Sequence, residues 1–570
     1  MLGLDVVVRV DMSAGTVATE RAIPGYEKLG GRGLTSRIIL DEVKPTADPL
    51  GPHNKLVIAP GLLGGTVASS SGRVSIGAKS PLTGGVKESN AGGTAGHKLA
   101  RLGIKAIVVE GQPADGRLYV LRIAKDGCEL VGAGGLKGLG TFDTVKHLHE
   151  EYGKDVGVMA IGQAGEMCMA AACVAVSDPE GRRKFAARGG LGAIMGSKGL
   201  KAIVVDDRGA EGVKYADRDA FLALSKDFAK QLMDNPKLGK NYKLYGTAGI
   251  VNAVNAIGAF PTRNFSCGQF EHASKLSGET LHDTIVARGG QTGIGCMAGC
   301  LIMCSNVYVD ASGNELVSTL QYENIALLGS NCCIGNLDEV AILNGLCNDY
   351  GLDAIEMGAT LAVAMEAGIV PFGDSEGAAR LLREVGEGTV LGRVLGQGAL
   401  VTGRVFGVRR VPHAKGQAMP GYDPRSLKGN GVLYATSPMG ADHTAGNAFG
   451  SRDKVNQLLP DGQNELSRRL QIDAAMLDMI GMCIFARPPL LSNREIVPAM
   501  LNARYGWGLT AGDIEEISRE VLRVEKEFNR RAGFAEAHDR LPEWFGEEPL
   551  PPHNTVFDVN DADLDEVLSI

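Results

Sequence analysis

Residues 55–96 read KLVIAPGLLGGTVASSSGRVSIGAKSPLTGGVKESNAGGTAG and indicate how the first third of the chain folds. The runs KLVIAP and RVSIGA are short and rich in β-branched residues, which is typical of strands. The glycine-rich segments GLLGGT and SNAGGTAG that follow them are typical of turns. Upstream, DVVVRVD-MSAG-TVATERAI predicts a hairpin, and further strand-like runs occupy residues 105–111, 117–123, 156–162 and 201–207. We therefore predict a β-rich N-terminal domain over residues 1–206.

The character of the sequence changes near residue 215. From there, apolar residues recur at the spacing of one helix face. The segments with this pattern are residues 217–235, 278–290, 338–351, 353–368, 377–388, 465–485 and 513–533. A looser stretch rich in proline and glycine, residues 407–450, separates the first five from the last two. We predict an α+β multidomain protein with two mainly helical domains, residues 207–406 and 407–570, and with a cofactor at the interface of the domains.

Composition excludes several classes of protein. The 570 residues include 79 glycines without a short repeat, about twice the ~7% average, so many backbone positions turn sharply or approach something closely. The net charge of −8 lacks the basic character of a nucleic-acid binder. The longest apolar stretch, residues 167–176, is far shorter than the ~20 residues of a membrane span. Charged residues near the N-terminus argue against a signal peptide, so we expect a cytoplasmic protein whose cysteines are thiols or metal ligands.

Three of the eleven cysteines lie close together. Cys296, Cys300 and Cys304 occur within GCMAGCLIMCSN at residues 295–306. A continuous helix would separate the outer two by roughly 12 Å, too far for one compact cluster. Gly295 and Gly299 weaken such a helix, so we expect an irregular loop that wraps zinc or an iron–sulfur cluster. A fourth ligand is needed, and the candidates are Cys332, Cys333, Cys347 and Cys483.

Several separated motifs resemble the tungsten- or molybdenum-pterin aldehyde:ferredoxin oxidoreductase family. The resemblance runs from GGRGL at residues 30–34 to RLPEWFGEEPLPPHNTVFD at residues 540–558. Between them lie SGRVSIGAKSPLTGG with SNAGG (71–93), ARGGLGAIMGSKGLKAIVV (187–205), the cysteine triad, YENIALLG (322–329), NDYGLD (348–353), SPMGADH (437–443) and DMIGMC (478–483).

The resemblance implies one tungsten or molybdenum held by two pyranopterins beside a [4Fe–4S] cluster. Matched to the family pattern, Cys483 is the fourth cluster ligand, with Asp478 and the backbone of Met482 against one pterin. In the twin element, Asn348 and Asp353 face the other pterin. An ionised carboxylate suits the N–H donors of a pterin edge because it only accepts hydrogen bonds.

The same resemblance assigns residues to the pterin phosphates, which a magnesium ion bridges in this family. Arg73, Asn90 and Gly92 fall near one phosphate, and Arg188 with Gly189 near the other. Arginine binds phosphate through two parallel hydrogen bonds, and glycine lets backbone approach an anion.

For catalysis, the resemblance implies that Glu323 is the general base and that His443 donates a hydrogen bond to the substrate oxygen or shuttles a proton. Tyr322 is a further candidate substrate contact. The implied reaction converts small aldehydes to carboxylic acids and passes electrons through the cluster to ferredoxin or an iron–sulfur subunit. A second hypothesis keeps the cofactor in a reductive catalytic subunit that acts on an aromatic thioester or carboxylic acid within a larger electron-transfer complex. A third is a non-catalytic iron–sulfur carrier.

The sequence departs from the family pattern at three places. Three residues, not two, separate Cys296 from Cys300, and Asn348 stands where aspartate is usual. Ile342 occupies the position of a histidine that binds a bridging iron in some relatives, so a homodimer is possible but no metal between subunits is expected. Lys237, Lys240 and Lys243 are candidates for docking ferredoxin. A radical-SAM enzyme is disfavoured, because the alternating strand–helix pattern of its barrel does not follow the triad.

Overall fold

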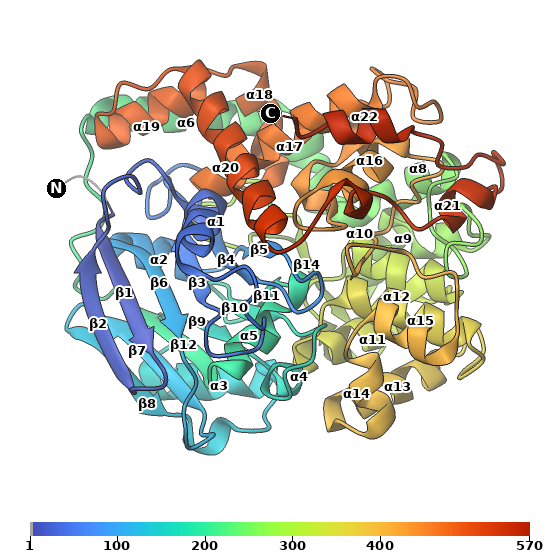
Figure 1. The fold of residues 1–570 in the computed structure, drawn as a ribbon, viewed down its shortest axis with the longest axis horizontal. Helices are drawn as coiled ribbons and strands as arrows, with labels where there is room; N and C mark the ends of the chain where they lie inside the picture. The colour runs from blue at the N-terminus through green and yellow to red at the C-terminus, as the bar shows by residue number, and fades with distance from the viewer. Residues whose placement is uncertain (1–3, 570) are drawn as a thin grey trace.

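The computed structural model describes residues 4–569. The first third of the chain forms two six-stranded sheets, drawn blue to green in Figure 1. One sheet has the order β2-β1-β6-β3-β4-β5 and contains β1 (Val6–Asp11), β2 (Thr16–Arg21), β3 (Leu56–Pro60), β4 (Val74–Lys79), β5 (Val86–Ala91) and β6 (Ile104–Glu110). The other has the order β11-β10-β9-β12-β7-β8 and contains β7 (Tyr119–Ala124), β8 (Gly127–Gly132), β9 (Gly157–Ala160), β10 (Val174–Ser177), β11 (Arg183–Ala186) and β12 (Leu200–Asp206).

The two sheets repeat one topology. Each begins with an antiparallel hairpin, β1–β2 or β7–β8, and ends with a strand parallel to its first, β6 or β12. A 12-residue helix follows each hairpin, α1 (Gly31–Glu42) in one half and α3 (Thr141–Tyr152) in the other. A seven-residue helix precedes each last strand, α2 (Ala95–Arg101) and α5 (Leu191–Ser197). The N-terminal domain is therefore built from two topologically equivalent halves.

The hydrophobic core of this domain lies between the sheets. Val8 and Ile58 of the first sheet and Leu121 and Ile203 of the second belong to one fully buried cluster. On the outer faces, α1 covers the first sheet and α3 covers the second. Burial of each such side chain stabilises the fold by about 1.5–3 kcal/mol. The alternation of inward and outward residues thus holds the two repeats together as one body.

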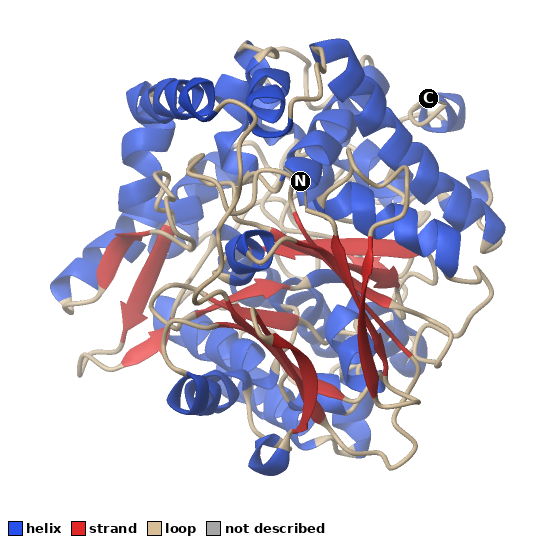
Figure 2. Ribbon diagram, turned by 90° about the vertical axis from the view of Figure 1, so that its left-hand side faces the viewer, coloured by secondary structure: helices blue, strands red, loops and turns tan. Residues whose placement is uncertain are grey.

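The rest of the chain is mainly helical, as Figure 2 shows. The longer helices are α6 (Arg218–Asp234), α9 (Gly278–Ala287), α11 (Leu337–Tyr350), α12 (Ala354–Glu366), α13 (Ser375–Glu387), α15 (Ala399–Phe406), α16 (Lys428–Thr436), α17 (Gln463–Ile480), α19 (Ile496–Tyr505) and α20 (Ala511–Arg531). A three-stranded sheet of β13 (Gln291–Ile294), β14 (Ser305–Val309) and β15 (Glu315–Val317) lies among them. The predicted fold class is confirmed: a β-rich N-terminal region precedes a helical remainder.

The helical remainder packs as one piece. A single hydrophobic cluster includes Leu395 and Ala399 before residue 406 and Val411 and Met419 after it. The division of the helical part at residues 406 and 407 stays a prediction. In residues 4–569, no single helix is long and apolar enough to cross a membrane, and two sharply bent helix pairs reach that length and composition only jointly.

Candidate functional site

The edge strands β5 and β11 of the two sheets lie beside each other and border a cavity of about 890 Å³. The walls opposite come from the helical part, including α11, α12 and α17. Sequence-predicted site residues from seven separated motifs line this one space: Arg73, Asn90, Gly92, Arg188, Cys296, Cys304, Glu323, Asn348, Asp353, His443, Asp478 and Cys483. Of the remaining three, Cys300 contacts the other thiols, whereas Gly189 and Met482 lie outside the lining.

In the first half of the site, the end of α17 closes against the end of β3. Gly481 ends α17 in the left-handed conformation, with φ of 74°, and a Cβ on the facing Gly61 would lie 2.1 Å from the Gly481 nitrogen. Only glycine permits this approach. The Arg73 amide donates to the Gly481 carbonyl at 3.1 Å, and the Cys483 amide donates to the Ser70 carbonyl at 2.9 Å. These contacts bring Cys483 to the N-terminal domain.

Asp478 is the centre of the polar network in this half. Its carboxylate accepts a 3.0 Å hydrogen bond from the Asn90 amide and lies 3.4 Å from Arg32. The Arg73 guanidinium donates to the side chain and the carbonyl of Asn90. Arg32 is held in turn by two hydrogen bonds of 2.7 and 2.8 Å to buried Glu525. Burial raises the pKa of Asp478, and the two arginines oppose that rise.

The second half repeats this backbone arrangement at the end of α11. Gly351 ends that helix with φ of 71°, and a Cβ there would lie 2.7 Å from the nitrogen of Gly162, which follows β9. The Cys173 amide donates to the Gly351 carbonyl at 2.8 Å, and the Asp353 amide donates to the Ala171 carbonyl at 2.9 Å. Asp353 therefore stands where Cys483 stands in the first half.

Asp353 and Arg188 form a buried ion pair at the mouth of this half. One Asp353 oxygen caps α12 by accepting from the Ile355 amide, and the other lies 3.1 Å from Arg188 Nε. The two terminal nitrogens of Arg188 donate to the carbonyls of Ala441 and Ala418. The Arg188 guanidinium is thus engaged by protein atoms on all sides. It ties the second half to the segment that carries His443.

Two predicted cofactor contacts are already paired within the protein. The amide of Met482 donates to the Leu477 carbonyl at 2.9 Å, and its side chain is fully buried. The Gly189 carbonyl accepts from the Ser80 hydroxyl at 2.8 Å, and its φ of 83° lies in the left-handed region. The assignment of Met482 and Gly189 as cofactor contacts stays a prediction.

The cysteine triad lies on an irregular loop between β13 and β14, as the sequence predicts. Gly299 and Met303 have φ of 73° and 51°, which interrupt any helix. Cys483 reaches this loop from the end of α17, and its charge affects the pKa of both Cys296 and Cys304. The four thiols that the family pattern assigns to one cluster are therefore neighbours.

The electrostatics of the thiols differ sharply. A hydrogen bond from Cys296, assisted by the amides of Met303 and Ile302, lowers the pKa of Cys300 to about 6. Burial raises the pKa of Cys304 to about 12 and also raises that of Cys483. No three His, Cys, Asp or Glu side chains within residues 4–569 meet the geometry that a single metal ion requires.

Glu323 and His443 face each other across the cavity. Glu323 Oε1 lies 3.5 Å from His443 Nε2. Among residues 4–569, neither Glu323 Oε1 nor His443 Nδ1, both buried, has a hydrogen-bond partner. The other Glu323 oxygen accepts from the Gly421 amide at 2.7 Å. Burial raises the pKa of Glu323, and the charge of His443 opposes the rise. A buried carboxylate with one free oxygen is equipped to accept a proton.

The neighbours of this pair fix its geometry. Asp442, next to His443, accepts a 2.6 Å hydrogen bond from buried Lys87 and caps the turn that carries the histidine. Lys87 and Arg188 lower the pKa of Asp442 despite its burial, so it stays ionised. Tyr422 packs its ring 6.0 Å from that of His443, and Tyr322 donates its hydroxyl to the Gly421 carbonyl.

Sequence reasoning missed several cavity residues, above all Glu88, Arg183 and Tyr422. Glu88 lies on strand β5, which was not among the predicted strands; the overlapping segment SNAGGTAG at residues 89–96 was predicted as a turn. The available signal was the repeat itself: KAIVVE at residues 105–110 and KAIVVD at residues 201–206 form the equivalent strands β6 and β12. Aligning the halves on these strands would have identified β5 and β11 as counterparts.

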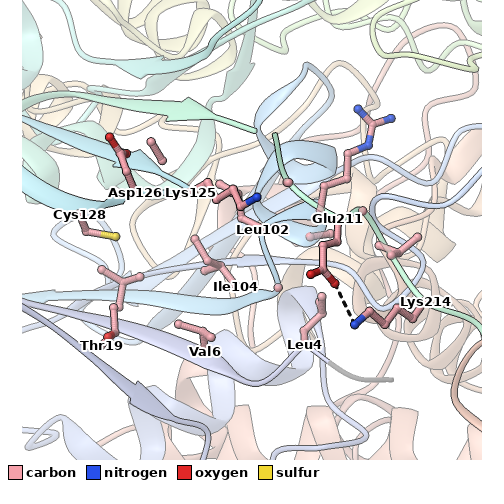
Figure 3. A pocket seen from close by; sticks show the side chains of 18 of the residues that line it. Leu4, Val6, Thr19, Leu102, Ile104, Lys125, Asp126, Cys128, Glu211 and Lys214 are labelled. Atoms are coloured by element: carbon pink, nitrogen blue, oxygen red, sulfur yellow. Dashed lines mark ion pairs between the residues drawn. The ribbon is translucent and has the colours of Figure 1, made fainter. Parts of the chain in front are cut away.

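A second cavity, of about 490 Å³, lies away from this site at the opposite edge of the sheets (Figure 3). Val6 and Thr19 of the first hairpin and Cys128 of the second line it, together with Glu211 and Lys214, which form a 2.9 Å ion pair. It contains none of the predicted site residues.

Known proteins with similar sequences agree with this architecture. Family models described as the aldehyde ferredoxin oxidoreductase N-terminal domain and domains 2 and 3 match residues 7–207 and 223–569. The chain is 34% identical to the tungsten-containing aldehyde ferredoxin oxidoreductase of Pyrococcus horikoshii, over 96% of this chain and 92% of that protein. It is 27% identical to the aliphatic sulfonate oxidoreductase, WOR-like subunit, of Pyrococcus furiosus, over 87% of this chain and 81% of that protein.

A solved structure shares the fold. It is titled the active site complex BamBC of benzoyl coenzyme A reductase in complex with 1,5 dienoyl-CoA, with a TM-score of 0.81 over 95% of this chain and 91% of that one. Its sequence identity is 21%, so the likeness concerns the fold alone. The matches over nearly the whole length show that the chain is an oxidoreductase of the aldehyde ferredoxin oxidoreductase family.

Proposed function

We propose that the protein oxidises aldehydes to carboxylic acids with a tungsten bis-pyranopterin and passes the electrons through a [4Fe–4S] cluster to ferredoxin. The observation that carries the proposal is the Glu323–His443 pair, which shares one cavity with both half-sites and Cys483. Tungsten is favoured over molybdenum because several similar proteins are named as tungsten-containing. Protein atoms do not make this choice, since pterin sulfurs bind the metal.

The residues of the cavity fit such a group. The buried polar atoms on its walls that lack partners within residues 4–569 include Glu88 Oε1, Arg183 Nε, Glu323 Oε1 and His443 Nδ1. Buried polar groups are almost always hydrogen-bonded, so these atoms favour a bound polar group. A volume of about 890 Å³ is at the upper end for a small-molecule site. Asp478 and Asp353 would hold one pterin each, and Cys296, Cys300, Cys304 and Cys483 would hold the cluster.

When bound, the bis-pterin metal takes an electron pair and the cluster releases electrons singly. The chain itself supplies acid–base chemistry. Glu323 removes a proton from the water or aldehyde hydrate through its free Oε1. Its raised pKa makes it a stronger base than an exposed glutamate. The Gly421 amide holds the other oxygen and fixes the direction of the carboxylate.

His443 donates a hydrogen bond to the substrate oxygen through Nε2, which lies 3.5 Å from Glu323 Oε1. Lys87 and Asp442 hold the turn beneath it, so His443 is positioned before the substrate arrives. The rings of Tyr422 and Phe449, 5.9 Å apart, provide an apolar wall that excludes water. Preorganised groups in a dry pocket stabilise developing charge better than solvent does.

We further propose that Asn90 and Gly92 would help to hold a magnesium ion at the pterin phosphates, and that the enzyme acts in the cytoplasm. Lys237 lines the cavity, and Lys240 and Lys243 follow it on the same surface segment. These lysines are the proposed ferredoxin contact. The assembly of subunits, including a homodimer, stays a prediction.

The test is metal analysis of the isolated protein combined with an aldehyde-dependent dye-reduction assay under anaerobic conditions. We expect iron together with tungsten, and dye reduction that requires an aldehyde. Zinc alone would contradict the proposal. Metals present without aldehyde oxidation, together with co-purifying iron–sulfur subunits, would instead favour the reductive function on an aromatic thioester or carboxylic acid.

A further inference from the structure

Two edge strands of the duplicated domain carry opposite charges at the same position. In the first half Val74 pairs with Ala91, and in the second Val174 pairs with Ala186. Three residues further along each ladder, Gly77 pairs with Glu88 and Ser177 pairs with Arg183. The matching registers of the two ladders therefore make Glu88 and Arg183 equivalent positions.

Both side chains point at the cavity with unmet hydrogen-bonding capacity. Glu88 is 3% exposed, and its Oε1 is buried without a partner although the Ser75 hydroxyl bonds the carboxyl group. Arg183 Nε is likewise buried without a partner. Within residues 4–569, no carboxylate lies within 4 Å of Arg183, although the charges of Glu315, Asp349 and Asp178 act on it from farther away. Burial raises the pKa of Glu88 to about 8 and lowers that of Arg183. Burying a polar group without a hydrogen-bond partner costs free energy of folding unless a bound group supplies the partner.

The residues around Glu88 and Arg183 also differ in charge between the two halves. Glu88 lies near Asp478 and Arg32, the second residue of α1. The equivalent second residue of α3 is Phe142, and the Arg183 guanidinium stacks over its ring at 3.8 Å. The residue equivalent to Asp478 is Asn348, because residues 478–483 and 348–353 end α17 and α11 in the same way. One half therefore has two carboxyl groups where the other has a cation and a neutral amide.

We propose that Glu88 and Arg183 are positioning residues that hold two chemically identical pterins by opposite edges. Glu88 accepts hydrogen bonds, beside Asp478, from the amino and ring N–H donors of one pterin. Arg183 donates to the carbonyl or ring-nitrogen acceptors of the other. A pterin ring has both kinds of edge, so two copies of one ligand satisfy both half-sites. This inference rests on the proposed bis-pterin function.

A difference in reduction potential follows from the charges. A carboxylate near one pterin disfavours added electrons at the metal, and a guanidinium near the other favours them. Removing either charge shifts the potential of the metal, and the two shifts have opposite signs. A residue that merely supports the fold would not produce shifts of opposite sign.

The experiment uses the full-length protein with its metals, as Glu88→Gln, Arg183→Gln and the double variant. The readouts are pterin and tungsten content per chain and the reduction potential of the metal, followed by electron paramagnetic resonance in a redox titration. It is performed at pH 9, above the value near 8 to which burial raises the pKa of Glu88. We expect Glu88→Gln to raise the potential, Arg183→Gln to lower it, and the double variant to lie between.

Glu88→Asp and Arg183→Lys serve as matched controls because each keeps its charge, and both are expected to retain the wild-type potential more closely than the glutamine variants. Unchanged potentials, or shifts of the same sign, in glutamine variants that retain pterin and metal would overturn the inference. If a glutamine variant loses the cofactor, the aspartate or lysine variant must restore its content, and failure to do so would also contradict the inference. A wild-type protein without pterin would instead overturn the proposed function.

Discussion

The two halves of the cavity have the same backbone but different chemistry. In each, a helix ends in a left-handed glycine, Gly481 or Gly351, that packs against a glycine following a strand. The next residues donate equivalent amide hydrogen bonds to the N-terminal domain, from Cys483 in one half and Asp353 in the other. A duplicated scaffold thus presents a thiol on one side and a carboxylate on the other.

The difference between the halves indicates on which side electrons leave the proposed centre. The thiol of Cys483 faces Cys296, Cys300 and Cys304, whereas Asp353 faces Arg188. The half with the thiols is equipped to hold a redox cluster. The half with the ion pair is equipped to fix the positions of the segments around the cavity. Substitutions in the two halves should therefore impair different properties of the protein.

The largest expected effect is on the thiol half. Cys483→Ala removes one proposed cluster ligand and leaves a buried gap that no other side chain fills. We expect loss of the iron–sulfur signal and of aldehyde-dependent dye reduction, with iron and tungsten content measured separately. Iron should fall while tungsten is largely retained.

Cys128→Ala is the matched control, because Cys128 is a half-buried thiol on β8 away from the cavity. It should keep full iron content and activity. Retention of a complete four-iron cluster in the Cys483 variant would show that the halves do not differ as described.

The second-largest effect is expected from substituting Glu323, which lies between the two halves. Glu323→Gln keeps the shape of the side chain and removes the base. General-base catalysis typically contributes ~10²–10⁴-fold, so kcat should fall by that amount with metals unchanged. Steady-state kinetics on metal-matched samples measure this. A fall of less than tenfold would exclude Glu323 as the base.

Much of this comparison was predictable from the sequence, but different features follow from different sequence signals. The hairpin, the strands at residues 55–60 and 105–111 and the long helices follow from local periodicity. The irregular loop of the triad follows from glycine spacing. The convergence of Cys483 on that loop came from the family resemblance, because contacts between distant segments leave no local signal. Strand β5 was missed because its polar residues Lys87 and Asn90 meet charged partners inside the protein and not solvent.

The internal duplication of the N-terminal domain was also visible in the sequence but was not used in the predictions. The identical KAIVV segments at residues 105–109 and 201–205 mark it. The full engagement of Arg188 by Asp353 and two carbonyls was not predictable, because those carbonyls come from loops after residue 410.

A smaller effect is expected in the carboxylate half. Asp353→Asn leaves the Arg188 charge buried with a weaker partner and keeps a capping oxygen for α12. Breaking a buried ion pair costs about 3–5 kcal/mol when one partner is removed, and the amide retains part of this. Thermal unfolding should show a clear fall in Tm, whereas Glu547→Gln, which breaks an exposed pair with Arg409, should change it little. Equal stability of the two variants would contradict the positional role.

The pH dependence of the reaction gives a more modest signal. The pKa of Glu323 is raised above the ordinary value of 4.5 by burial. A base works when deprotonated, so kcat/KM should fall as pH decreases through that raised pKa and level off above it. The Glu323→Gln variant should lose this acidic limb. An acidic limb that persists in the variant would assign it to another group.

The smallest effect is expected from making the halves more alike. Asn348→Asp restores the carboxylate that Asp478 provides in the first half. Because Arg183 is nearby and unpaired with an acid within 4 Å, we expect the new charge to be tolerated, with little loss of pterin content. The same substitution combined with Arg183→Gln should reduce pterin content more. Equal pterin content in the single and combined variants would show that the two positions are independent.

The most direct test of the account is anomalous diffraction from crystals of the isolated protein at the iron and tungsten absorption edges. The account predicts one heavy-atom peak between the two halves, beside Glu323 and His443, and iron peaks confined to the side of Cys483. Iron beside Asp353, a heavy atom outside the cavity, or four cysteines without iron would contradict it.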